Sequence, residues 1–374
     1  MGRQEQISMI RERKKETKTD TVLLILVLLL AVFGLVMLFS ISEYNGRVRF
    51  GDSAYYFKKQ LFATALGLMT MYIVAETDYR FFVRLAPAAY LLSMGLSTAV
   101  LFVGQEINGS RRWLNFGPLS FQPSEFAKAA VILFLTWQIQ GSKKTTAGFW
   151  FMCRTMLTLL PIVGLVGSNN LSTAIIILGI GVILIFISDP GYARFVGMGV
   201  TGAAVIAVFL AAESYRLERL AIWRNPEKYE KGFQTIQGLY AIGSGGLLGK
   251  GLGQSIQKLS FLPEPQNDMI FAVICEELGL FGAICLILLY LLIIWRFMVI
   301  ANNAADLYGA LLVVGIMAHI SIQVVLNIAV VTNTIPNTGI SLPFVSYGGT
   351  SILFLLSEMG LALSVSRGIK FEVT

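Results

Sequence analysis

Long apolar runs separated by short polar segments recur along the whole chain. Ten of these runs approach the roughly 20 residues that a helix needs to cross the hydrocarbon of a membrane. They lack the period-2 alternation of a membrane β-barrel, and a helix satisfies its own backbone hydrogen bonds within lipid. The pattern therefore predicts an all-α, polytopic membrane protein with about ten transmembrane helices. The runs cover about 21–43, 57–75, 85–104, 125–140, 149–168, 171–188, 195–212, 269–296, 309–332 and 343–366.

Composition supports this fold class and excludes several chemistries. Of 374 residues, 55% are hydrophobic and only 14% are charged, which exceeds what a soluble core can bury. Three cysteines without a CxxC spacing and a single histidine exclude a zinc site and a Cys/His dyad. The stretch "GSGGLLGKG" lacks the Gly-Lys-Ser/Thr ending of a phosphate loop. We therefore expect no certain cofactor, with a divalent cation as an open candidate, and no nucleic acid partner.

Charge along the chain predicts its orientation. Basic residues crowd the first 20 positions, and the positive-inside rule places such a cluster in the cytoplasm. Residues 1–20 are therefore expected to form a cytoplasmic tail, and 21–374 a single membrane domain whose C-terminus is also cytoplasmic. The segment 213–268, between the seventh and eighth spans, is then a long external loop. The basic residues of the tail are Arg3, Arg11, Arg13, Lys14, Lys15 and Lys18.

Three polar motifs fall on the predicted external side. One reads "NGSRRWLNFGPLSFQPSEFAK" (108–128), the second ends the long loop with "LPEPQND", and the third reads "NTIPNTGISLPFVSYGGTS" (333–351). These motifs, in this order, resemble the SEDS family (shape, elongation, division and sporulation), whose members include RodA, FtsW and SpoVE. The resemblance covers essentially the whole chain.

The resemblance implies an activity and partners. It implies a peptidoglycan glycosyltransferase of ten spans that polymerises lipid II into glycan strands at the outer face of the bacterial cytoplasmic membrane. Implied partners are lipid II, the growing glycan strand, a class B penicillin-binding protein and other divisome, elongasome or sporulation proteins. The aspartate that the family requires matches Asp268. By this analogy Asp268 is the catalytic general base, which takes the proton of the acceptor sugar's 4-hydroxyl as undecaprenyl diphosphate leaves with inversion.

Physical chemistry leaves two interpretations of Asp268 open. A positioned carboxylate accelerates attack by a hydroxyl by about 10²–10⁴-fold. Asp268 precedes a predicted helix, however, where the helix dipole stabilises the carboxylate and weakens it as a base. The like charge of Glu264 acts in the other direction and raises the pKa. The alternative is that Asp268, or Asn267, only caps this helix.

Further residues are candidates for substrate binding. External cations can stabilise the negative charge that develops on the leaving diphosphate. Glu125 and Lys128 share a helix face at i,i+3, so they form either a functional pair or a structural ion pair. Glu276 and Glu277, inside the eighth span, are expected to serve packing or a buried polar network. The predicted substrate-binding set is Arg111, Arg112, Glu125, Lys128, Arg216, Arg219, Gln237, Lys258, Glu264 and Ser346.

The third motif and one departure from the family concern the shape of the site. Pro336 and Pro343 limit helix continuation, and the nearby glycines permit a re-entrant or tightly turned backbone. The alternative is that Gly348 and Gly349 only let neighbouring helices approach closely. Ser346 offers a hydroxyl to sugar or phosphate. Many family members carry an acidic residue between the fifth and sixth spans, where this chain has Asn170 within "SNNLSTA". A charged role for that turn is therefore not expected here.

Two other classes of function remain open on the sequence alone. A lipid II flippase or transporter also needs basic residues and a groove, but it needs sites on both faces, whereas the polar motifs are all assigned to one. A non-catalytic scaffold for a penicillin-binding protein needs no carboxylate at Asp268. The residues "EPQN" before Asp268 do not separate the division, elongation and sporulation branches, although the loop as a whole favours division or sporulation.

Overall fold

The computed structural model describes most of the chain as a helical bundle. The described residues are 19–107, 110–116, 119–142, 148–189, 191–211, 214–259 and 261–369, so residues 1–18 of the predicted cytoplasmic tail lie outside them. The all-α class is confirmed. The helices are α2 (Thr21–Phe50), α3 (Tyr55–Glu76), α4 (Tyr79–Val103), α5 (Pro123–Ser142), α6 (Phe149–Asn169), α7 (Leu171–Ser188), α8 (Tyr192–Ala211), α9 (Ser214–Arg224), α10 (Phe233–Ser244), α11 (Ile270–Asn302), α12 (Leu307–Val331) and α13 (Gly349–Arg367).

Each of the ten predicted spans corresponds to one of these helices. By length and composition, seven helices of the described part can cross a membrane: α2, α4, α6, α7, α11, α12 and α13. The other three, α3, α5 and α8, do not meet the same criterion, so the count of ten stays a prediction. In α5 the reason is plain, because Glu125 and Lys128 place two charges in its first two turns.

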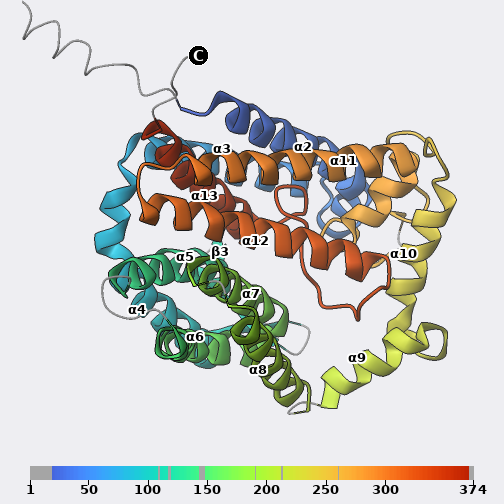
Figure 1. Cartoon of the computed structure of the whole chain (residues 1–374). Helices are drawn as coiled ribbons and strands as arrows, with labels where there is room; N and C mark the ends of the chain where they lie inside the picture. Colours follow the sequence, from blue (N-terminus) through green and yellow to red (C-terminus); the bar gives the residue numbers. More distant parts are fainter. Residues whose placement is uncertain are drawn as a thin grey trace, which may run out of the picture.

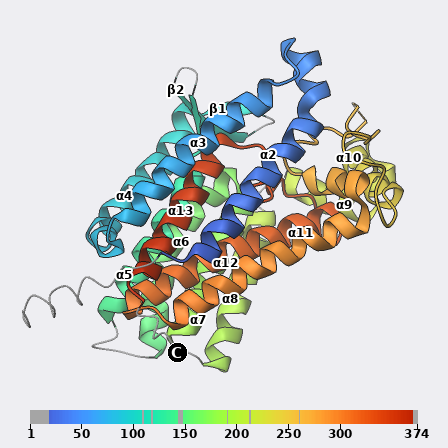
Figure 2. The ribbon, with the colours of Figure 1, turned by 90° about the horizontal axis from the view of Figure 1, so that it is seen from above.

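The long helices pack side by side around α12 and α13. α13 packs against α3 and α12, α11 packs against α12 and α2, and α5 contacts α4, α7 and α12. Figure 2 shows α2, α11 and α12 running in similar directions beside α13. The start of α2 meets the end of α13, where the backbone N–H of Asp20 donates to Ser366 Oγ at 3.1 Å. Both ends of the described chain therefore lie at one end of the bundle, while α9 and α10 lie at the right edge of Figure 1.

Helix starts follow ordinary capping chemistry. Asp20 caps α2 by accepting from the Leu23 N–H, and Asp306 caps α12 by accepting from the Gly309 N–H. Asn170 caps α7, since its side chain accepts from the Thr173 N–H at 3.2 Å. Asn170 thus has a structural use that needs no charge, in agreement with the expectation for this turn.

Helix α11 is kinked near its start by a glycine. Gly279 has φ +68°, and a Cβ there would lie 2.3 Å from the backbone nitrogen of Gly249. The glycine-rich turn after α10 therefore packs directly on the kink, with backbone N–H groups of Lys250 and Gly251 donating to the Glu276 and Glu277 carbonyls at 2.9 Å. Only glycine permits this backbone contact.

A small antiparallel sheet stands between α4 and α5, which the sequence reading did not anticipate. Its strands β1 (Gln105–Ile107), β2 (Ser110–Phe116) and β3 (Leu119–Phe121) are ordered β1-β2-β3. β2 packs against α4, α5 and α6. The first polar motif is thus a folded hairpin that leads into α5, not an open loop.

The segment 213–268, predicted as the loop between the seventh and eighth spans, is folded: it contains α9 and α10, followed by turns that run to the start of α11. One boundary differs from the predicted ones. The last span begins at Gly349 and not at 343, because Phe344 has φ +64° and the segment 332–348 is non-helical. The predicted re-entrant character of the third motif agrees with this irregular backbone, whose Ile340, Leu342, Phe344 and Val345 are buried.

Candidate functional site

The three polar motifs meet at the end of the bundle that holds the start of α11. The third motif, 333–351, contacts the other two. Thr350 donates to the carbonyl of Ser120, which lies in the first motif, at 2.9 Å. The third motif also contacts α7, where Ser172 donates to the Thr338 carbonyl. On its other side, the Tyr347 N–H donates to the Gln266 carbonyl at 2.9 Å. This convergence makes the region around residue 268 the candidate active site.

Asp268 is held in place by its backbone, while its side chain has no capping role. Its carbonyl accepts from Asn327 Nδ2 of α12 at 2.9 Å, and the same nitrogen donates to the Ile340 carbonyl at 2.7 Å. The N-cap position of α11 is Met269, which makes no side-chain capping bond. The interpretation of Asp268 as an N-cap is therefore wrong in this structure. Asn267 does not hold the N-cap position either, and its amide nitrogen donates to Glu264 Oε2 at 2.6 Å.

The environment of the Asp268 carboxyl raises its pKa to about 6. Burial is the main cause, because it disfavours the ionised form, and the Glu264 carboxylate adds to the shift. Arg219 and the hydrogen bond from Gln234 lower the pKa in part. A carboxylate with a pKa near the operating pH is suited to general base catalysis.

Gln234 and Asn337 complete the surroundings of Asp268. Gln234 Nε2 of α10 lies 3.4 Å from Asp268 Oδ1, and Asn337 Nδ2 donates to Gln234 Oε1 at 3.0 Å. Arg219 Nη1 of α9 donates to the Asn337 carbonyl at 3.1 Å, so a cation stands close to the carboxylate. Gln237, and not Gln234, is the glutamine of α10 in the predicted substrate-binding set. The two lie three residues apart on one helix, so spacing alone cannot choose between them.

Glu264 shapes the turn before Asp268. Its φ is +49°, a strained value for a residue other than glycine. Its carboxylate pairs with Arg49 Nη1 at 2.8 Å at the end of α2, and Arg49 was not singled out from the sequence. Strained backbone conformations of this kind often occur next to functional groups. A direct role of Glu264 in substrate binding stays a prediction.

Arg111 and Arg112 lie on β2 beside the start of α7. Arg112 Nε donates to the Asn169 carbonyl at 2.8 Å, and Asn169 Nδ2 donates to the Arg111 carbonyl at 2.9 Å. They line a small cavity of about 20 Å³ together with Ser124 and residues of α6. The Arg111 side chain is exposed. The Arg216 side chain lies outside the described residues, although its backbone is in α9.

Glu125 and Lys128 form the ion pair that their spacing predicts. Lys128 Nζ lies 3.0 Å from Glu125 Oε1 and donates to Gln323 Oε1 at 2.9 Å. Lys128 is 1% exposed and Glu125 is 6% exposed. Direct contact between this pair and a substrate stays a prediction, since the pair is closed off here.

Two predicted substrate-binding residues have structural partners instead. Lys258 is buried, with Nζ 2.8 Å from Glu277 Oε1 and donating to the Ser40 carbonyl at 3.1 Å, so its contact with a substrate stays a prediction. The Ser346 hydroxyl donates to the Asn267 carbonyl at 2.6 Å and accepts from the Leu342 N–H at 2.8 Å. Its proton is already used within the protein. Ser346 thus holds the turn that carries Asp268, while Lys258 joins α2 to α11.

The buried network expected for Glu276 and Glu277 is confirmed. Glu276 pairs with Lys250 at 2.6 Å and accepts from Ser255, while Glu277 pairs with Lys258. Both carboxylates are completely buried. Among the described residues, no group of three or more His, Cys, Asp or Glu side chains could hold a metal ion.

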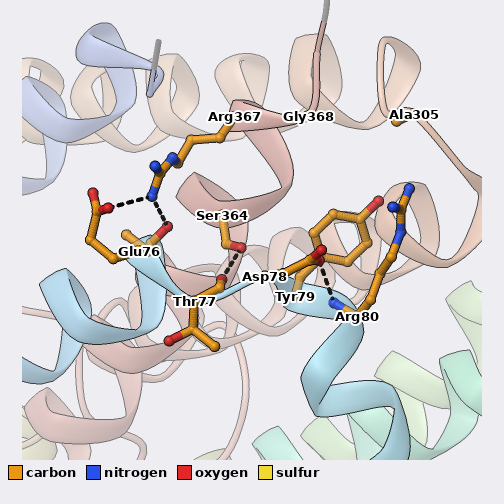
Figure 3. A pocket seen from close by; sticks show the side chains of 10 residues that line it. Glu76, Thr77, Asp78, Tyr79, Arg80, Ala305, Ser364, Arg367 and Gly368 are labelled. Carbon is orange, nitrogen blue, oxygen red and sulfur yellow. Dashed lines mark hydrogen bonds and ion pairs between the residues drawn. The ribbon is translucent and has the colours of Figure 1, made fainter. Parts of the chain in front are cut away.

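A larger cavity lies at the opposite end of the bundle. It has a volume of about 350 Å³ and is lined by residues at the end of α3, the start of α4 and the end of α13. Figure 3 shows the Arg367 guanidinium directed at Glu76, 2.8 Å from Oε2, and the Ser364 hydroxyl directed at Thr77. Ala305, which follows α11, lines this cavity, whereas Asp268 precedes α11. The cavity is therefore separated from Asp268 by the length of that helix and is not part of the candidate site.

Comparison with known proteins agrees with this geometry. The chain is similar to "Stage V sporulation protein E" of Bacillus subtilis, with 39% identity over 365 residues covering 94% of this chain and 98% of the relative. It is 34% identical to the "Probable peptidoglycan glycosyltransferase FtsW" of Trichlorobacter lovleyi, with 97% of each chain covered.

Two solved structures share the fold. One is described as "Structural coordination of polymerization and crosslinking by a peptidoglycan synthase complex"; it has a TM-score of 0.80 and 30% identity, and the match covers 93% of this chain and 98% of that one. The other is the rod shape determining protein RodA of Thermus thermophilus, with a TM-score of 0.72, 28% identity, and 95% and 98% coverage. The family model described as "Cell cycle protein" matches residues 20–370. The resemblance seen in the three motifs is thus confirmed, and the chain belongs to the FtsW, RodA and SpoVE family of cell cycle proteins.

Proposed function

We propose that this protein is a peptidoglycan glycosyltransferase that polymerises lipid II, with Asp268 as the general base. The observation that carries the proposal is the state of Asp268, a half-buried carboxyl with a pKa of about 6 and no capping role, at the point where three polar motifs meet. The relative named a probable peptidoglycan glycosyltransferase supports the same class of enzyme.

The proposed chemistry uses three kinds of group. The Asp268 carboxylate takes the proton from the acceptor sugar's 4-hydroxyl, whose oxygen bonds to the anomeric carbon of the donor while the bond to the diphosphate breaks. Attack from the face opposite the leaving group gives inversion. Gln234 orients the carboxylate through the contact at 3.4 Å. Arg219, Arg111, Arg112 and Arg216 are the candidates for stabilising the charge on undecaprenyl diphosphate, because such charge is best met by preorganised cations.

The proposed location is the bacterial cytoplasmic membrane, with the Asp268 end outside. Multiple apolar helices support a membrane protein. The start of α2 and the end of α13 meet at one end of the bundle, as an even number of spans requires, and Asp268 lies at the other end of α11. The basic residues of 1–20 place the end that holds both termini in the cytoplasm.

The proposed partner is a class B penicillin-binding protein that crosslinks the product. Support comes from the solved structure described as coordinating polymerization and crosslinking in a peptidoglycan synthase complex, which matches this chain at a TM-score of 0.80. Other proteins of the division, elongation or sporulation machinery are further expected partners.

The test is glycan polymerisation from lipid II by the purified chain in proteoliposomes, with and without a class B partner. Asp268→Asn removes the base and keeps the shape of the side chain, while Asp52→Asn, which changes a half-buried acid between α2 and α3, is the matched control. We expect polymer from the wild type and the control and none from folded Asp268→Asn. Movement of lipid II between leaflets without polymer would instead indicate a transporter. If the chain made no polymer but raised the activity of its class B partner, and Asp268→Asn did so equally well, this would indicate a scaffold.

A further inference from the structure

A chain of polar side chains crosses the interior of the bundle between α5, α12 and α13. It starts at Glu358 of α13, whose Oε2 lies 2.7 Å from His319 Nδ1 of α12. His319 Nε2 lies 2.9 Å from Gln323 Oε1, and the same oxygen accepts from Lys128 Nζ at 2.9 Å. His319, Gln323 and Glu358 are each 1% exposed. Such a set is expensive inside a membrane unless its donors and acceptors match.

The orientation of the Gln323 amide follows from its neighbours. An ammonium group has donors only, so the atom that faces Lys128 must be the amide oxygen. This leaves Gln323 Nε2 to donate to the Ser341 carbonyl, which lies at 3.0 Å. Because the Gln323 oxygen also faces His319 Nε2, that ring nitrogen must carry a hydrogen.

A second proton is then required on the other side of the ring. A neutral imidazole has one N–H, and here it is on Nε2. The unprotonated Nδ1 would face a carboxylate oxygen at 2.7 Å, lone pair against lone pair. A proton on Nδ1 or on Glu358 removes this conflict.

The charge count gives the same answer. Without the extra proton, Glu125, Lys128 and Glu358 sum to one negative charge in the bundle interior, with His319 neutral. With it, the set is neutral. Glu358 Oε1 is buried and has no hydrogen-bond partner among the described residues, which further disfavours an uncompensated carboxylate.

We propose that His319 and Glu358 form a proton-binding site inside the membrane domain, which holds one shared proton and positions Lys128 through Gln323. Both are positioning residues, since neither touches the candidate site. Loss of the proton sets a bare nitrogen against the carboxylate, which separates the pair and removes the ring that orients Gln323. Asn327 lies one turn beyond Gln323 on the same face of α12 and holds the Asp268 carbonyl, so a shift of α12 reaches the active site as well.

Few other ionisable groups face this pair. α5 supplies Glu125 and Lys128. α13 supplies Glu358 itself and Arg367, which pairs with Glu76 of α3 at 2.8 Å. The other titratable side chains of α3, which packs on α13, are Tyr55, Tyr56, Lys58, Lys59 and Tyr72. α7, which also packs on α12, has no acidic, basic, Cys or Tyr side chain. On α11, Glu276, Glu277 and Arg296 are paired with Lys250, Lys258 and Asp20, and Tyr290 donates to the Pro343 carbonyl. The other titratable side chains of α11 are the buried Cys275 and the exposed Cys285. α10 supplies only Tyr240, which is exposed.

The single histidine of the chain allows a direct test on the intact protein. Histidine labelled with ¹⁵N in nanodiscs reports the protonation of both ring nitrogens of His319. The carboxyl infrared difference between wild type and Glu358→Gln reports whether Glu358 carries a proton. We expect, at neutral pH, either a doubly protonated ring or an Nε2–H ring with a protonated Glu358. A neutral ring together with an ionised Glu358, or an Nδ1–H ring, would overturn the proposal.

A second test measures activity and rests on the proposed lipid II polymerisation. The spectroscopic test does not, so a failure of the proton-binding proposal can be told apart from a failure of the proposed function. Glu358→Gln mimics the protonated carboxyl, because its amide donates to Nδ1 without any added proton. We expect wild-type activity to fall at alkaline pH as the shared proton is lost. Glu358→Gln should keep activity within about twofold of wild type at neutral pH and should not show this fall. His319→Ala should lower kcat with little change in KM, by up to about 100-fold if Lys128 is misplaced. An alkaline limb unchanged in Glu358→Gln contradicts the positioning role.

Discussion

Asn327 of α12 binds two motifs with one amide nitrogen, since Nδ2 donates both to the Asp268 carbonyl at 2.9 Å and to the Ile340 carbonyl at 2.7 Å. Asn327 is completely buried. The position of Asp268, the candidate base, is therefore fixed by a contact with α12 in the centre of the bundle.

Replacement of Asn327 should uncouple the two motifs. Asn327→Leu leaves two buried carbonyls without a donor, at about 1–3 kcal/mol each. We expect a lower melting temperature and a loss of polymerisation that exceeds the loss of folded protein. Asn303→Leu, an exposed asparagine that follows α11, is the control and should behave as wild type. Normal activity in folded Asn327→Leu would show that Asp268 does not depend on this contact.

The pH profile of polymerisation should report Asp268. The base acts when ionised, and its pKa is raised to about 6, so activity should fall as pH drops through this value. Arg219 lowers this pKa and Glu264 raises it. Arg219→Gln should therefore move the acid limb to higher pH, and Glu264→Gln should move it to lower pH. If the acid limb moved in the same direction in both variants, its assignment to Asp268 would be contradicted.

The contribution of Asp268 to stability should fall as pH rises, whereas its contribution to activity should increase. A carboxyl whose pKa is raised on folding stabilises the protein when protonated, and this contribution is lost as pH rises from the usual 3.8 towards about 6. The neutral Asp268→Asn should therefore be more stable than wild type at pH 7 to 8, by on the order of 1–3 kcal/mol. The difference should shrink below pH 4. Thermal unfolding in one detergent across this range is the measurement, and a destabilised Asp268→Asn at neutral pH contradicts it.

The buried pair of Lys258 and Glu277 gives a test that separates structure from substrate binding. Lys258→Met leaves Glu277 buried and uncompensated, which should destabilise the protein by about 3–5 kcal/mol. The double variant Lys258→Met/Glu277→Met should recover most of this loss. If Lys258 instead bound the diphosphate, the double variant would be stable but would show a raised KM. Unfolding midpoints and KM measured on the same preparations distinguish these outcomes.

The helices were predictable from sequence because each apolar run is long and ends at polar residues. The corrections fall where the chain is short or irregular. β1 to β3 lie in segments of three to seven residues that carry too few positions to show a period. The last helix starts six residues later than the apolar pattern suggests, because burial of Phe344 and Val345 in a turn looks the same in the sequence as burial in a helix.

The site was predictable where one residue, or two residues one helical turn apart such as Glu125 and Lys128, carried the signal. Asp268 was found by resemblance, and its raised pKa agrees with the effect expected from Glu264. Lys258 was a candidate for diphosphate binding because its partner Glu277 lies on another element, 19 residues further along, and could not be identified from spacing. The orientation of a lysine towards lipid, substrate or a buried acid is decided by packing, which spacing alone does not reveal.

The choice between Gln234 and Gln237 is the sharpest remaining test of the site. Both lie on α10 and both are half-buried, but Gln234 lies 3.4 Å from Asp268 Oδ1 and accepts from Asn337 at 3.0 Å. Gln234→Ala should lower kcat and raise the pKa seen in the acid limb, because it removes a hydrogen bond that favours the ionised carboxylate. Gln237→Ala is the matched control on the same helix and should leave the acid limb in place. A raised KM in Gln237→Ala alone would instead assign it to substrate binding, as the sequence suggested, while leaving Gln234 as the group that orients the base.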